Sequence, residues 1–348
     1  MDIFLNFLAG SEKAFFNFMS ETNEKEKIAL ISHTDLDGLA AARVVNEVVQ
    51  ADLIKFVNYH EINNDLLEEL KKNKIKRAIF TDLALENEEF LKEAEKFLKV
   101  LWIDHHTFPR DYNSEKTVYL NVQGFCATYI CYYLFSKISN LEKLDWLVAS
   151  ASISDWLYFN NQEFMSKIFK KYSDKFEIQD STIRKSGLFW DFQWNLSLLI
   201  IYFAKDLNYL FNNFPVSPHL PENLKKHSDE IQAEITHEIE KVEREKISIK
   251  EGYFAEISPK FNVGSIISSL LSGKYWNKKI IIIHEKGNLL KISARRQDKK
   301  ENLPELLKEL VKNIPNSTAG GHIPAAGATI PLEYKEKFKQ NIFRMLSP

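Results

Sequence analysis

Residues 99–106, KVLWIDHH, combine a short apolar run with the chemically active sequence Asp104-His105-His106. The run from Lys99 to Ile103 predicts a buried β-strand, and the three polar residues fall at its carboxyl end. In open α/β sheets, binding and catalytic sites form outside the carboxyl ends of the strands. Taken alone, the stretch is equally consistent with a surface loop that carries two histidines.

Three further apolar runs also end at aspartate. Residues 27–32 lead into the sequence HTDLDG at 33–38, residues 77–81 lead into Asp82, and residues 147–154 lead into Asp155. A single aspartate after a strand is most often the N-cap of the next helix. Four such runs in one order instead indicate that their carboxylates meet at one edge of a sheet.

Carboxylates brought into one cleft cannot all stay ionised unless a cation neutralises them. The aspartates concerned are Asp35, Asp37, Asp82, Asp104 and Asp155. A bound divalent metal resolves this repulsion, and a mixed carboxylate and imidazole set suits manganese, iron or zinc better than magnesium. Two such ions about 4 Å apart would polarise a phosphoryl oxygen and activate a water molecule, which are the two requirements of phosphoester hydrolysis.

A second group of candidate residues lies near the C-terminus, where residues 320–327 read GGHIPAAG. Gly320 and Gly321 permit close approach of a ligand to the backbone, and His322 can donate a hydrogen bond to phosphate. The alternative is an ordinary pair of turn glycines. Upstream, Ser293 and Arg295 share one face of a predicted strand, and an arginine suits bidentate phosphate contact. The neighbouring Arg296 and the lysines around it, including Lys279, are expected in solvent.

These motifs, in this order, resemble the DHH phosphoesterase superfamily, and the glycine-rich stretch resembles the signature of its DHHA1 domain. The resemblance implies that Asp82 bridges two metal ions. It implies that Asp37, His105 and Asp155 complete one metal site, and that Asp35 and His33 complete the other. It implies that His106 contacts the substrate phosphate or donates a proton, and that Asp104 orients a histidine. In the second domain it implies a substrate-binding role for Ser293, Arg295, Gly320, Gly321 and His322.

The composition sets further limits. The chain has 348 residues, a net charge of −2 and 27% charged residues, so it is no polybasic nucleic-acid coat protein. No apolar run approaches the length of a membrane span and no signal sequence is visible, which predicts a cytoplasmic protein without membrane contact. Cys126 and Cys131 lie five residues apart on a predicted helix and fit neither a disulfide framework nor a zinc pattern.

The order of predicted elements indicates an α/β protein of two domains. An amphipathic helix is expected over residues 1–22. After it, strands alternate with helices, which predicts a mainly parallel, doubly wound sheet. We expect a DHH catalytic domain over residues 1–195, a helical connector over 196–250 and a smaller α/β DHHA1 domain over 251–348. A charged helix is expected over Glu222–Lys246. The helical region could dock a protein partner, whose identity the sequence does not give.

The expected function is a manganese-dependent phosphodiesterase that releases nucleoside monophosphates from short single-stranded RNA or DNA. A long strand normally needs a positive groove and stacking aromatic residues, and the chain has no strong basic tract. The same motifs also fit a phosphatase for 3′-phosphoadenosine 5′-phosphate, a cyclic-dinucleotide phosphodiesterase or a RecJ-like 5′ exonuclease. A catalytically silent binding subunit is the alternative from another class, although no motif aspartate is replaced.

Overall fold

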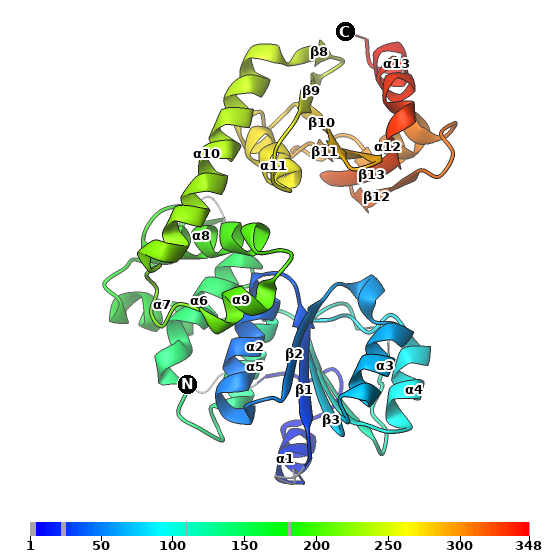
Figure 1. Cartoon of the computed structure of the whole chain (residues 1–348). Helices are drawn as coiled ribbons and strands as arrows, with labels where there is room; N and C mark the ends of the chain where they lie inside the picture. The colour runs from blue at the N-terminus through cyan, green and yellow to red at the C-terminus, as the bar shows by residue number, and fades with distance from the viewer. Residues whose placement is uncertain (1–4, 22–25, 109, 180–181, 348) are drawn as a thin grey trace. The chain divides into compact units, whose positions relative to one another are not determined.

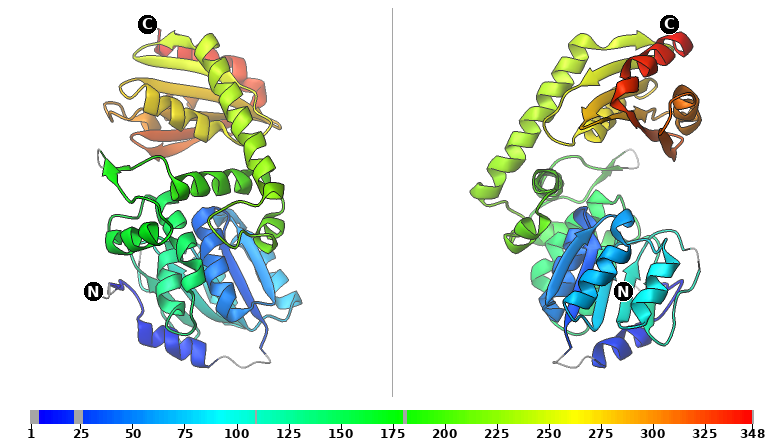
Figure 2. Two further views of the ribbon diagram at one scale, coloured as in Figure 1. Left: turned by 90° about the vertical axis from the view of Figure 1, so that its left-hand side faces the viewer. Right: turned by 45° about the vertical axis from the view of Figure 1, so that its right-hand side comes forward.

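The structure is a computed structural model that describes residues 5–21, 26–108, 110–179 and 182–347. The chain folds into two compact units, residues 1–228 and residues 229–348. The boundary falls inside one continuous helix, α10 (Glu222–Glu245), which agrees with the charged helix expected there (Figure 2).

The first unit is built around a five-stranded parallel sheet. Its strands are β1 (Ile28–His33), β2 (Leu53–Val57), β3 (Arg77–Thr81), β4 (Lys99–Asp104) and β5 (Thr117–Asn121). Its helices are α1 (Glu12–Ser20), α2 (Leu36–Val49), α3 (Asn64–Lys72), α4 (Glu88–Glu95), α5 (Ala127–Phe135), α6 (Asp145–Ser154), α7 (Gln162–Lys171), α8 (Leu188–Tyr202) and α9 (Leu207–Asn212). Short elements complete it: the 3₁₀ turns η1 (Tyr59–Glu61) and η2 (Glu142–Leu144), and the hairpin of β6 (Ile178–Gln179) and β7 (Thr182–Ile183).

The strand order is β2-β1-β3-β4-β5, with every pair parallel. Helices α2 and α5 lie on one face of the sheet, and α3 and α4 lie on the other (Figure 1). In this doubly wound order the connections leave β1 and β3 in opposite directions, which opens a crevice at their carboxyl ends. The sequence-based prediction of a doubly wound parallel sheet is therefore confirmed.

The strands are hydrophobic because both faces are covered. All five residues of β3 are buried, and Phe80 of β3 stacks on Trp102 of β4 with ring centroids 4.2 Å apart. The indole N–H of Trp102 donates to the carbonyl of Leu83 at 2.6 Å, so this buried polar group is satisfied. The same bond fixes the loop that leaves β3, which is the loop that carries Asp82.

The second unit is a six-stranded mixed sheet in the order β12-β13-β11-β10-β9-β8. The strands are β8 (Ile247–Ile249), β9 (Gly252–Ile257), β10 (Lys279–Lys286), β11 (Leu289–Arg295), β12 (Thr318–His322) and β13 (Ala325–Pro331). Only the β9–β10 pair is parallel. The remaining elements are α11 (Gly264–Lys274), α12 (Leu303–Val311), the turn η3 (Leu332–Tyr334) and α13 (Lys335–Met345). Helices α12 and α13 share one hydrophobic core with the sheet (Figure 1).

Two expected boundaries differ from the structure. The N-terminal helix spans only Glu12–Ser20, because Ser11 caps its first turn; residues 1–4 of the expected helix lie outside the described residues. The boundary expected after residue 195 falls within α8, which packs on α6 in the first unit. No helix in the described part of the chain is long and apolar enough to cross a membrane.

Candidate metal centre

The carboxyl ends of β1, β3 and β4 bring the motif residues together. Strand β1 ends at His33, β3 delivers Asp82 one residue later, and β4 ends at Asp104. Asp35 caps α2 through the backbone N–H of Gly38 at 3.0 Å, and Asp37 lies in the first turn of that helix. A Cβ on Gly38 would lie 2.4 Å from the carbonyl oxygen of His33, so the tight turn into α2 requires glycine.

Asp82 occupies a demanding backbone position. Its φ is +59°, which is unfavourable for a residue with a side chain, and the side chain is buried. The backbone N–H donates to the carbonyl of Ile103 at 3.1 Å, and the next residue, Leu83, is held by Trp102. The surrounding structure therefore fixes the direction of this carboxylate.

One oxygen of Asp82 faces a first group of potential ligands. The Asp82 Oδ2 atom lies 3.7 Å from His33 Nδ1, and the same nitrogen is 2.9 Å from Asp35 Oδ2. Ligand atoms of His33, Asp35 and Asp82 all lie within 4.8 Å of one another, which is compact enough for one cation.

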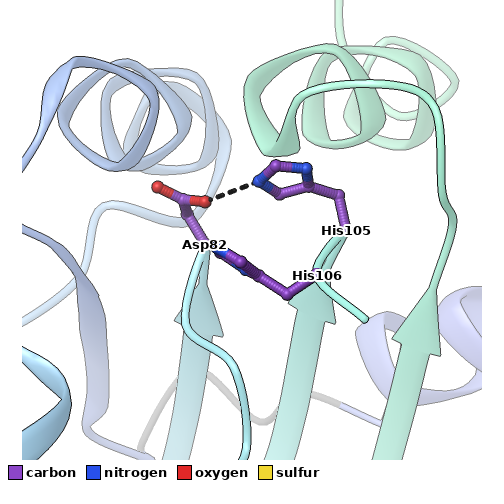
Figure 3. Close-up of side chains that lie close together, drawn as sticks. All are labelled: Asp82, His105 and His106. Atoms are coloured by element: carbon purple, nitrogen blue, oxygen red, sulfur yellow. Dashed lines mark hydrogen bonds and ion pairs between the residues drawn. The ribbon is translucent and has the colours of Figure 1, made fainter. Parts of the chain in front are cut away.

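The other oxygen of Asp82 faces a second group. His105 Nε2 lies 3.1 Å from Asp82 Oδ1, and Figure 3 shows the two side chains pointing toward each other from neighbouring strand ends. The same nitrogen is 3.7 Å from Asp37 Oδ2 and 3.5 Å from Asp155 Oδ2. The residues Asp37, His105 and Asp155 form a second compact group. Asp82 thus presents one oxygen to each group.

Asp155 reaches the site from a helix, which corrects the expectation that it follows a strand. Residues 145–154 form α6, and Asp155 is the residue that ends it. The run 147–154 reads LVASASIS, in which serines alternate with apolar residues as they would in a strand. Because α6 is buried over Asp145–Ile153, it has no polar face that would reveal the helical period.

Asp37 is held by a contact that the sequence did not indicate. The N-terminus of α5 donates to its carboxylate, from Ala127 N at 2.6 Å and from Thr128 N at 2.9 Å. The hydroxyl of Thr128 adds a third bond at 2.6 Å. These donors orient the carboxylate and, with the positive end of the helix, stabilise its charge.

We expect Thr128→Val to weaken manganese binding about 10- to 100-fold, because a group that orients a metal ligand usually contributes that much. The variant loses the hydroxyl bond to Asp37 and keeps both backbone donors. Thr128→Ser keeps the hydroxyl and should bind manganese like the wild type. Calorimetric titration of metal-free protein measures both affinities, and equal affinities for Thr128→Val and wild type would exclude this orienting role.

His106 belongs to a hydrogen-bonded chain. Its Nδ1 lies 2.6 Å from Asp104 Oδ1, and its Nε2 lies 3.1 Å from the hydroxyl of Tyr59. Burial opposes protonation, but the neighbouring Asp104 raises the pKa of His106 above its ordinary value. Tyr59 comes from the η1 turn and also lies against the His33 ring, with centroids 5.1 Å apart. No motif in the sequence marked Tyr59.

The electrostatics of the site fit a cation. Burial, followed by the charges of Asp37 and Asp35, raises the pKa of Asp82 well above its usual range. Burial and the charges of Asp37 and Asp82 likewise raise the pKa of Asp155. Asp82 Oδ2 is buried and accepts no hydrogen bond from the described residues. A buried oxygen without a donor, among competing carboxylates, is what a divalent ion would satisfy.

This charge arrangement predicts that metal-free protein loses stability as the pH rises. Burial lowers the pKa of His33, but Asp35 and Asp82 raise it by more, to about 10. Protonation of His33 therefore stabilises the fold fully below the unfolded pKa near 6.5, and this stabilisation is lost as the pH rises through 10. The raised pKa values of Asp82 and Asp155 act in the same direction, since deprotonation adds like charges. Thermal melting with a chelator should therefore give lower midpoints at pH 9 than at pH 6, and manganese should reduce the difference. A constant or rising midpoint in the chelated sample would contradict this.

The second unit places most of its predicted residues on one face of the sheet. Ser293 pairs with Gly327, which pairs with Gly320; two positions away, Arg295 and His322 both pair with Ala325. Ser293 and Gly320 line an open pocket of about 580 Å³. A Cβ on Gly320 would meet nothing within 4 Å, so its backbone is open to a ligand.

Gly321 serves the backbone. Its φ is +129°, and a Cβ there would lie 2.5 Å from the carbonyl oxygen of Ala325. Residues of this strand alternate between faces, so Gly321 projects away from the face that carries Gly320 and His322. Its glycine is required by the strand pairing.

His284 also lines this pocket, although no sequence motif marked it. Its side chain is buried, and neither ring nitrogen has a hydrogen-bond partner among the described residues. Burial, with the charges of Lys286 and Lys291, lowers the pKa of His284. A Cβ on Gly264 would lie 2.6 Å from the ring, so glycine at the start of α11 makes room for it. A lone histidine in the apolar run of β10 gave no signal.

Two charged residues expected in solvent are buried. Arg296 is 4% exposed and forms ion pairs with Glu251, Asp298 and Glu301, which neutralise it. Lys279 is 2% exposed and pairs with Glu301 at 2.7 Å. Strand alternation predicted the face of Arg296 but not the acidic residues that cover it.

Comparison with protein families matches residues 253–347 to the DHHA1 domain. Comparison with curated protein sequences gives no match. Among solved structures, the exonuclease RecJ bound to manganese is similar over 99% of this chain and 95% of its own, with a TM-score of 0.67 and 14% identity.

Two further structures share the fold. RecJ from Thermus thermophilus in complex with Mn2+ has a TM-score of 0.65 and 14% identity; 96% of this chain aligns with 54% of that longer one. The pGpG-specific phosphodiesterase PggH from Vibrio cholerae has a TM-score of 0.52 and 15% identity, over 92% of this chain and 98% of its own. These similarities establish the RecJ-type architecture.

Proposed function

We propose that this chain is a member of the DHH/DHHA1 phosphoesterase superfamily and hydrolyses short single-stranded oligonucleotides. Two findings support this proposal: residues 253–347 match the DHHA1 domain, and the chain has the RecJ-type fold. The reaction would release nucleoside monophosphates and use two divalent ions. Manganese suits this mixed set of carboxylate and imidazole ligands best. The observation that carries the proposal is Asp82, whose two oxygens face two separate groups of ligand atoms.

The metal ligands proposed are His33, Asp35, Asp37, Asp82, His105 and Asp155. When bound, two cations would supply charge neutralisation at the phosphate and a water of lowered pKa. The chain's own contribution is orientation: Asp82 is fixed by its backbone contacts, and Asp37 by the N-terminus of α5. The buried surroundings strengthen each of these electrostatic interactions.

We assign proton transfer to His106. Asp104 holds its Nδ1 and favours the protonated ring, which leaves the proton on Nε2 available to the departing ribose or deoxyribose oxygen. The Tyr59 hydroxyl lies against that nitrogen and sets the direction of the ring. In the second unit, Ser293, Arg295, Gly320 and His322 share the face proposed to hold the substrate.

A panel of substrates tests the proposed preference for short strands directly. Purified protein with manganese should cleave labelled RNA of two to five residues faster than a long RNA or DNA strand. The same panel contains 3′-phosphoadenosine 5′-phosphate and cyclic di-AMP. Preferential cleavage of either small nucleotide, or digestion of long strands from the 5′ end, would replace the oligonucleotide proposal with that activity.

A further inference from the structure

Trp156, the residue after Asp155, combines an unfavourable backbone with an exposed ring. Its φ is +58°, and the indole is 45% exposed. Its N–H donates to the carbonyl of Ile153 at 3.1 Å, and that of Leu157 to the carbonyl of Ser152 at 2.9 Å. These two bonds form the Schellman motif that ends α6, with Trp156 at the position normally taken by glycine. The helix end therefore does not require tryptophan.

The ring is held from the side and remains open to solvent. Trp190 of α8 meets it edge to face, with centroids 6.2 Å apart and an interplanar angle of 69°. The ammonium of Lys185 lies over one face of the Trp156 ring, 5.6 Å from its centroid, which leaves the other face for stacking. Three residues after Trp156, Phe159 is also exposed, at 44%, and packs on Tyr158. An oriented indole beside an exposed cation is a chemical match for a base and its phosphate.

The place of Trp156 in the chain connects this surface to the candidate metal centre. Consecutive Cα atoms are about 3.8 Å apart, so the indole starts beside a carboxylate that contacts His105 at 3.5 Å. Residues kept in a left-handed conformation against their preference concentrate at functional sites. The backbone of Trp156 therefore adjoins one of the proposed metal ligands.

We propose that a nucleobase of the substrate stacks on Trp156, with Lys185 contacting the adjoining phosphate. This inference rests on the proposed function, since it assigns a base-recognition role beside the same centre. Stacking also explains how a chain without a basic tract could hold a single strand, because a base can stack on an aromatic ring without a positively charged groove, and every base has a face that can stack.

The decisive variant is Trp156→Gly, because glycine suits the backbone of the Schellman motif and keeps the helix end. Calorimetry with the full chain, manganese and a phosphorothioate dinucleotide should show about 5- to 150-fold weaker binding, the equivalent of ~1–3 kcal/mol per stacked base. Trp156→Phe should recover most of the affinity. An abasic dinucleotide should bind wild type and Trp156→Gly equally. Trp276→Ala removes a 61% exposed indole from the second unit and should bind like the wild type.

The inference is overturned if Trp156→Gly binds the base-bearing dinucleotide as tightly as the wild type does. It is also overturned if the substitution weakens binding of the abasic dinucleotide by the same factor, or if the wild type binds neither dinucleotide. Hydrolysis is measured separately on an ordinary dinucleotide. Base-dependent binding without hydrolysis would remove the proposed function and keep the stacking role. If Trp156→Gly changes neither KM nor kcat for hydrolysis, the proposed function would stand and the stacking role would be excluded.

Discussion

Replacement of Asp82 by asparagine is expected to lower kcat/KM for a dinucleotide at least about 10³-fold. The two oxygens of this carboxylate face the two ligand groups, so its charge would help to hold both ions. A 10³-fold loss corresponds to ~4 kcal/mol less stabilisation of the transition state. Asparagine is nearly the same size as aspartate, so packing is retained. Initial rates at matched manganese concentrations give the factor.

A stability measurement distinguishes this effect from misfolding. The pKa of Asp82 is raised by burial and neighbouring aspartates, so a neutral side chain relieves repulsion in metal-free protein. Asp82→Asn should melt at or above the wild-type temperature in chelator and gain less from manganese. An active variant with wild-type manganese stoichiometry would remove Asp82 from the bridging role.

The second large effect is expected for His106→Asn, which should lower kcat for a dinucleotide about 10²- to 10⁴-fold. The proposed role is proton donation from Nε2 to the departing oxygen, with Asp104 bonded to Nδ1. A p-nitrophenyl phosphodiester has a leaving group that needs no proton, so the variant should hydrolyse it at close to the wild-type rate. Comparing the two substrates isolates the proton-transfer step.

Manganese binding is the control for this variant, because His106 also lies near Asp82 and His105. Tyr59→Phe, which removes the hydroxyl beside Nε2, should have a smaller effect than His106→Asn on the same substrate. Equal losses on the dinucleotide and the nitrophenyl ester would assign His106 to phosphate or metal binding instead of proton donation.

The parallel sheet could be predicted from sequence because its strands are short apolar runs separated by helical patterns. The same runs located Asp82 and Asp104, since a polar residue directly after a buried strand must emerge at the carboxyl edge. Asp35, Asp37 and Gly38 followed from one compact motif. Each of these predictions depends on a short stretch of sequence, so the motifs and their order were sufficient to make it.

Contacts between distant segments could not be read in that way. Thr128 reaches Asp37 across 91 residues and Tyr59 reaches His106 across 47, and neither residue belongs to a motif. Arg296 is buried because Glu251 and Glu301 cover it, which periodicity along one strand cannot reveal. The left-handed backbone of Trp156 depends on how α6 ends, and tryptophan gives no sign of such a position.

The two-ion proposal is tested most directly by the rate of dinucleotide hydrolysis, measured against the number of manganese ions bound per chain. Metal-free protein is titrated with manganese while bound metal and released mononucleotide are determined on the same samples. Because Asp82 presents one oxygen to each of the two ligand groups, we expect hydrolysis to rise steeply as the second ion binds. Full activity in metal-free protein, or no mononucleotide with two ions bound, would contradict metal-dependent hydrolysis by this chain.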